Sequence, residues 1–111
     1  MQTEKNHAGE FLLSEGNGKI SREVITVAAE MDLEAGTVLG FNGTNHEDYD
    51  NAAADGTETA VGILYAGVNT VGGSATKAVM IKRFAEVNEH SLVGFDAAAR
   101  TDLEANHIYV R

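Results

Sequence analysis

The stretch Arg22-Glu23-Val24-Ile25-Thr26-Val27 decides the fold class, because it is the first part of the chain with a clear strand pattern. Four of its six residues are β-branched, and successive residues alternate between two faces. Four further segments are rich in apolar or β-branched residues: 37–40, 61–68, 77–87 and 107–111. We therefore predict a mostly β fold, in which the continuous apolar run 61–68 is covered on both sides.

A single helix is predicted near the C-terminal end, from Asp96 to Asn106. Asp96 is a suitable N-cap, and the three alanines that follow it have high helix propensity. Phe95, Ala99 and Leu103 recur at every fourth position, so they form one stripe that faces a core. Asn106 is expected to end the helix in the left-handed conformation.

Residues 1–21 are predicted to form a flexible N-terminal arm, and residues 22–111 a single β-rich domain. The arm is polar except for the short apolar patch Phe11-Leu12-Leu13, which Ser14 and a glycine-containing turn follow. Three apolar residues cannot form a core alone. The patch therefore either folds back onto the domain as a strand or pairs with the sheet edge of another chain, and the pattern allows both.

The composition limits the possible functions. A chain of 111 residues suits one domain with one modest core, and the absence of cysteine excludes disulfide frameworks and cysteine-based metal sites. The net charge is −9, and all of the excess lies in residues 1–60, with 12 acidic and 3 basic residues. Nucleic-acid binding requires clustered lysine and arginine, and anionic membranes repel an acidic surface. We therefore expect neither nucleic acid nor membrane as a partner.

Localisation signals are not evident in the sequence. No segment approaches the run of about 20 apolar residues that a membrane helix needs. The first ten residues are polar and do not form the apolar core of a signal peptide. Synthesis in the cytoplasm is the expectation.

The polar segment 41–56 holds the best candidate for metal chemistry. Its stretch His46-Glu47-Asp48-Tyr49-Asp50 offers four potential ligands within five residues. A calcium loop starting at Asp48 fails, however, because alanines stand at a ligand position and at the required glycine. The glycine-rich segment 67–73 lacks the lysine of a phosphate-binding loop. We therefore expect a solvated acidic loop, no catalytic residues, no metal and no cofactor, which favours a binding or structural protein over an enzyme.

Several segments together resemble the lambda-type bacteriophage head decoration proteins, also called capsid-stabilising proteins. The similar segments are Phe11 to Gly18, Ser21 to Val27, Leu33 to Gly40, Ala60 to Leu64 and Leu103 to Arg111. The resemblance covers about residues 8–111 and rests on many short matches. The lambda protein itself contains prolines, which this chain lacks.

The resemblance implies a β-clip-like small domain that forms a homotrimer. It implies that the trimer binds the outer face of the expanded capsid at three-fold positions and stabilises it against internal DNA pressure. The N-terminal arm would pair with a strand of the major capsid protein, with Phe11, Leu12, Leu13 and Ser14 as the contact residues. The protein would be made in the bacterial host cytoplasm and would function on the virion.

Two alternatives remain open from the sequence. The first is a small metal-dependent β-clip hydrolase, which would use the cluster at residues 46–50. The second is a carbohydrate-binding module, which would need exposed aromatic side chains on a β face. Aromatic residues make up only 6% of the chain, and tryptophan is absent.

Overall fold

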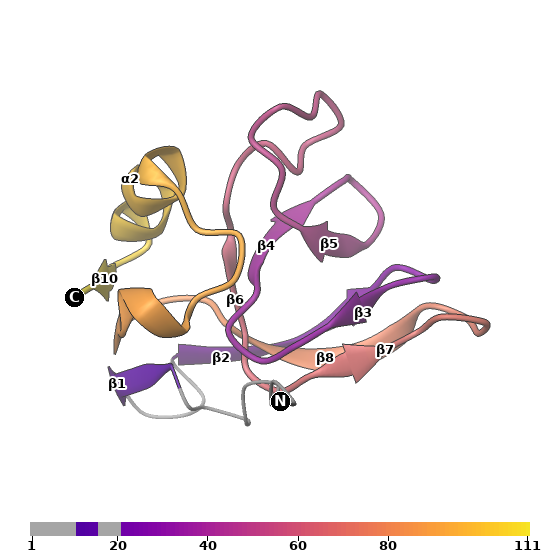
Figure 1. The fold of residues 1–111 in the computed structure, drawn as a ribbon, viewed down its shortest axis with the longest axis horizontal. Helices are drawn as coiled ribbons and strands as arrows, with labels where there is room; N and C mark the ends of the chain where they lie inside the picture. The colour runs from indigo at the N-terminus through magenta and orange to yellow at the C-terminus, as the bar shows by residue number, and fades with distance from the viewer. Residues whose placement is uncertain (1–10, 16–20) are drawn as a thin grey trace, which may run out of the picture.

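The structure is a computed structural model and describes residues 11–15 and 21–111 (Figure 1). The described residues are mostly β with one C-terminal α-helix, as predicted. The elements follow in this order: β1 (Leu12–Glu15), β2 (Arg22–Val27), β3 (Asp32–Leu33), β4 (Val38–Phe41), β5 (His46–Asp48), β6 (Gly62–Leu64), β7 (Val68–Asn69), β8 (Thr76–Ile81), β9 (Ala85–Val87), the 3-10 helix η1 (Glu89–Ser91), α2 (Ala97–Ala105) and β10 (Ile108–Val110).

Five strands close into a barrel in the order β2-β5-β4-β6-β8. The most extensive pairing joins β2 and β8 antiparallel, from Arg22 opposite Ile81 to Val27 opposite Thr76. The barrel closes where Val27 of β2 pairs with His46 of β5 in the parallel sense. Closure removes the free edges that an open sheet of these strands would present to other chains.

The other strands form two smaller sheets. In the three-stranded sheet β1-β9-β10, β9 is central, with β1 antiparallel and β10 parallel to it. Strands β3 and β7 form a two-stranded ribbon. The ribbon extends from one side of the molecule, whereas α2 and β10 lie on the opposite side (Figure 1). The β-clip assignment remains a prediction.

The barrel strands contribute to two clusters of buried side chains. One cluster comes from one face of the barrel strands: Ile25, Val27, Leu39, Leu64 and Met80. The other cluster joins alternate residues of β4, β6 and β8 to α2, β9 and β10: Val38, Ile63, Ile81, Ala85, Val87, Ala99, Leu103, Ile108 and Val110. Successive residues of a strand point to opposite faces, so β4 and β6 are buried on both faces. This result confirms the prediction of a strand covered on both sides within residues 61–68.

Gly62 marks a place where the backbone and a neighbouring strand approach closely. A Cβ atom at this position would lie 2.6 Å from the carbonyl oxygen of Ile81 and 2.6 Å from the sulfur of Met80. Real Cβ atoms do not tolerate such distances, so only glycine lets β6 pack here.

Two predicted strands are each divided in the structure. The run 61–68 separates into β6 and β7, because β7 leaves the barrel to pair with β3. The run 77–87 separates into β8 and β9, and Phe84 between them has a positive φ of 56°. An apolar, β-branched pattern does not reveal that successive residues pair in different sheets. The predictions of single strands over 61–68 and 77–87 are therefore wrong.

The predicted loop at residues 41–56 contains the strand β5, so it is not irregular throughout. Asn42 organises the turn before β5: its side-chain oxygen accepts hydrogen bonds from the backbone N–H groups of Thr44 (2.9 Å) and Asn45 (2.8 Å). Farther along, Asp55 accepts from the N–H and hydroxyl of Thr57 at 3.1 and 2.6 Å. Short side chains that bond to the nearby backbone stabilise such turns locally.

The helix α2 follows the prediction closely at its start. The carboxylate of Asp96 accepts a hydrogen bond from the N–H of Ala99 at 2.8 Å, which is the N-cap interaction. Ala99 and Leu103 are fully buried, and Phe95 packs against the same core. At the other end Asn106 has a φ of −99°, so its predicted left-handed conformation is wrong. The positive φ, 60°, belongs to His107 instead.

The N-terminal apolar patch folds back onto the domain in this structure. Phe11 is 0% exposed and lies in the core with α2 and β10. Its carbonyl accepts a hydrogen bond from the N–H of Asn88 at 2.7 Å, and β1 then pairs with β9. Residues 1–10 and 16–20 of the predicted arm lie outside the described residues. The flexibility of the arm and its boundary at residue 21 therefore remain predictions.

The different environments of Phe11 and Leu13 predict different effects on stability. The substitution Phe11→Ala empties a fully buried site and should lower the free energy of unfolding by about 3–5 kcal/mol. Leu13→Ala should change it by less than about 0.5 kcal/mol, because Leu13 is 55% exposed. Urea unfolding of both variants measures the difference. Equal effects would show that Phe11 is not part of the core in solution.

Candidate functional site

The acidic cluster at residues 46–50 does not form a common site. His46 lies with its ring centroid 4.9 Å from that of Phe41. The carboxylate of Glu47 accepts a hydrogen bond from the side chain of Asn42 at 2.6 Å. Because β5 alternates its side chains between two faces, neighbouring members of the cluster point apart.

The second half of the cluster is tied to α2. Tyr49 is buried, and its hydroxyl donates a hydrogen bond to the carboxylate of Asp96 at 3.0 Å. Asp50 accepts instead from the backbone N–H of Ala52 at 3.0 Å. Within residues 11–15 and 21–111, no group of three or more His, Asp or Glu side chains is placed to hold a metal ion.

Burial and hydrogen bonding shift the pKa of three of these groups. Burial lowers the pKa of His46, with an opposing contribution from Glu23, so the imidazole is neutral at pH 7. The hydrogen bond from Ala99 holds the pKa of Asp96 below its usual value. Burial, and then the bond to Asp96, raise the pKa of Tyr49 to about 12. These shifts arise from contacts that stabilise the fold.

A cavity of about 280 Å³ opens beside the barrel near His46. It is lined by Glu23, Phe41, His46, Val61, Met80 and Lys82. Lys82 forms an ion pair with Glu23 at 3.0 Å, so the two charged side chains of the lining compensate one another. Phe41, Val61 and Met80 contribute apolar side chains to the lining, and His46 contributes its imidazole.

The predicted contact residues of the arm are separated by the structure. Phe11 is in the core, and Leu12 packs against the same core. The register of β1 shifts between Leu12 and Ser14, and Leu13 at this irregularity is exposed. The backbone of Ser14 pairs with Glu86. Of the three apolar residues, only Leu13 presents most of its side chain to an external partner.

A group of exposed rings lies at the end of the same sheet. Phe84 is 47% exposed and Tyr109 is 41% exposed. The ring of His107 stacks on Phe84, with centroids 5.3 Å apart and an interplanar angle of 6°. Its Nδ1 lies 3.2 Å from the hydroxyl of Tyr109. We call Phe84, Glu86, His107, Tyr109 and Arg111 the β9–β10 face.

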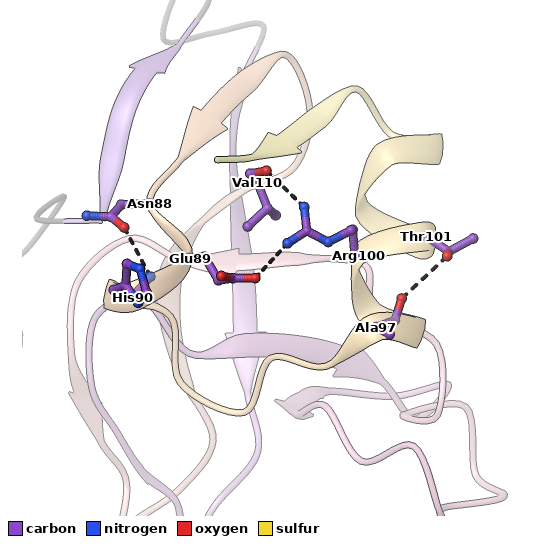
Figure 2. Close-up of polar contacts among 7 residues, drawn as sticks. All are labelled: Asn88, Glu89, His90, Ala97, Arg100, Thr101 and Val110. Carbon is purple, nitrogen blue, oxygen red and sulfur yellow. Dashed lines mark hydrogen bonds and ion pairs between the residues drawn. The ribbon is translucent and has the colours of Figure 1, made fainter.

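Arg100 fixes the strand that carries this face. Figure 2 shows its guanidinium reaching from α2 to η1 and β10: Nη1 donates to the carbonyl of Val110 at 2.9 Å, and Nη2 donates to Glu89 at 2.6 Å. The strand β10 is therefore held by pairing with β9 and by this side chain. A rigid support of this kind positions exposed side chains for binding.

The sequence contains a signal for part of the β9–β10 face. Alternation along residues 107–111 places His107 and Tyr109 on the same side, away from the buried Ile108 and Val110. No pattern identifies Phe84, because the sequence predicts that it lies within a continuous strand. Its exposure depends on the turn between β8 and β9.

A strand at the end of its sheet, as β1 is, together with exposed aromatic side chains is typical of a domain that binds other proteins. The family model described as bacteriophage lambda head decoration protein D matches residues 1–109. The chain therefore belongs to this family of structural phage proteins. Membership supports a role in phage capsid decoration, with capsid binding and a location on the virion.

No curated protein sequence matches the chain significantly. Among the described residues, no helix is both long and apolar enough to cross a membrane.

The raised pKa of Tyr49 predicts a stability loss at alkaline pH. The ordinary pKa of tyrosine is about 10, so above this pH the unfolded chain ionises while folded Tyr49 remains neutral up to about 12. Its contribution to stability is complete below pH 10 and declines as the pH rises through this window. In urea unfolding between pH 9 and 12, Tyr49→Phe should flatten the decline in the free energy of unfolding. Identical slopes for the variant and the unmodified protein would contradict the assignment.

Because the potential ligands at residues 46–50 point in different directions, we expect weak metal binding. Titration calorimetry with Mg²⁺, Mn²⁺ and Zn²⁺ should show no saturable site with a Kd below about 1 mM, because the ligands do not converge. The variant carrying His46→Ala, Asp48→Ala and Asp50→Ala should give the same result. A micromolar site that disappears in this variant would instead support the metal-dependent hydrolase.

Proposed function

We propose that this chain binds the outer face of the expanded phage head as a homotrimer at three-fold positions and stabilises the shell against the pressure of the packaged DNA. The observation that carries the proposal is the family match over residues 1–109. The edge strand β1 and the exposed Leu13 support it, because they provide main-chain and side-chain groups for a contact with another chain.

The stabilisation follows from differential binding. A protein that bridges neighbouring capsid subunits buries interface area only when the shell is assembled and expanded. It therefore shifts the equilibrium toward that state by the difference in its binding free energies for the two states. At a free concentration one hundred times the Kd, the gain is about 2.7 kcal/mol for each site.

The N-terminal segment provides the strand contact in this proposal. Residues 1–21 form the arm, which pairs with a strand of the major capsid protein. Phe11 fixes the root of the arm in the core, and Leu13 contacts the partner. Main-chain hydrogen bonds to an added strand give affinity, and alternate side chains give specificity.

Trimer formation strengthens this contact. Each arm loses conformational entropy when it becomes ordered, so the affinity of one arm is modest. Three arms on one trimer bind at a high effective concentration once the first is engaged. A trimer of chains that each carry −9 has a net charge of −27, which suits a position outside the shell and away from DNA.

Removal of residues 2–10 should separate binding from folding. The cut leaves Phe11 and β1 in place, so the thermal midpoint and the mass of the oligomer should remain those of the full chain. Binding to expanded heads should weaken at least about tenfold, because the strand contact is then limited to β1. Cosedimentation with heads that lack the decoration protein measures this. Undiminished binding of the shortened chain would show that the arm is not the main contact.

A further inference from the structure

The β9–β10 face is a continuous, nearly neutral surface. Tyr109 of β10 and Glu86 of β9 are direct neighbours in the parallel pairing, so their side chains share one side of the sheet. Arg111 pairs with Glu86 at 2.9 Å and lies with its guanidinium carbon 5.8 Å from the ring centroid of Tyr109. The charges of Glu86 and Arg111 thus compensate each other, and the other three residues of the face carry rings.

Two residues of the face hold an unusual backbone conformation. Phe84 has a φ of 56° and His107 a φ of 60°, and a bulky residue with positive φ is uncommon. The hydroxyl of the buried Ser21 donates to the carbonyl of Phe84 at 3.0 Å, and the N–H of Ala85 donates to the carbonyl of His107 at 3.1 Å. These bonds maintain the strained conformation, which directs the stacked rings into solvent. Strain of this kind is concentrated at functional sites.

The chemistry of the face fits a protein partner. Aromatic side chains and arginine are enriched at protein interfaces, and unpaired charges are depleted at their centres. The molecule as a whole carries −9, and all of this excess comes from residues 1–60. The one acidic residue of the face, Glu86, is paired with Arg111, so a neighbour can cover the face without desolvating an uncompensated carboxylate.

The face lies beside β1, the strand that carries the proposed capsid contact. β1 forms the edge of the sheet β1-β9-β10, and Leu13 lies at the irregularity in β1 that faces Glu86. A capsid strand that adds to this edge would extend the same sheet, and the capsid domain behind that strand would cover the outward side chains of β9 and β10. We propose that the β9–β10 face is a second docking surface for the capsid shell, with Phe84 and Tyr109 as its aromatic anchors. This inference rests on the proposed function.

The first experiment tests the face with substitutions that preserve the fold. Phe84→Gly suits the positive φ, and Tyr109→Thr retains a strand-forming residue. The double variant should bind expanded heads at least tenfold more weakly than the full chain, with an unchanged oligomer mass by sedimentation and an unchanged thermal midpoint. Val71→Ser, at an exposed valine in the turn after β7, is the matched control and should bind normally.

The second experiment needs no variant. Hydroxyl-radical footprinting of the full chain, free and bound to heads, should show protection of Phe84 and Tyr109 from oxidation only when the heads are present. Unchanged binding of the double variant, or protection already complete in the free oligomer, would overturn the proposal. Loss of the oligomer in the double variant would also overturn it, because the face would then join copies of this chain. Failure of the unmodified protein to bind heads would refute the proposed function itself, whatever the face does.

Discussion

The burial of β4 and β6 on both faces is the constraint on which the rest of the structure depends. A five-stranded barrel of this size fills its own interior, but apolar residues such as Val38 and Ile63 also point outward. Water cannot cover them without a loss of stability, since each buried aliphatic side chain contributes about 1.5–3 kcal/mol. The helix α2 and the sheet β1-β9-β10 supply the covering layer, and Phe11 completes it from the N-terminal side.

The sequence predicts where strands and the helix occur better than it predicts which strands pair with one another. The strand at residues 22–27, the N-cap at Asp96 and the stripe formed by Ala99 and Leu103 are all found in the structure, because each depends on local pattern and capping chemistry. The division of residues 77–87 was not predictable in this way. The division depends on which sheet each half joins: the first half, β8, pairs with β2, and the second half, β9, pairs with β10.

The predicted contact residues and the β9–β10 face show the same limit: the sequence does not reveal which side chains tertiary contacts bury or expose. The apolar patch at residues 11–13 was predictable as a distinctive feature of the N-terminal segment, but only tertiary contacts distinguish the core residue Phe11 from the exposed Leu13. Phe84 becomes exposed through a turn that the composition does not signal. Family membership, from the match over residues 1–109, gives the biological setting in which these surfaces act. Phe11 holds the segment on the domain, Leu12 packs against the same core, and Leu13 is exposed.

The pairing of β1 with β9 also determines how the molecule would carry a mechanical load. A pull applied before Phe11, along the axis of β1, would load the pairings of Leu12, Ser14 and Glu15 with β9 at the same time. Rupture in that direction requires several main-chain bonds to break together and a buried aromatic ring to leave its pocket. The same strand pulled sideways would release its bonds one after another. The pairing of β1 with β9 is therefore stronger against a shear force along the strand than against a force perpendicular to it.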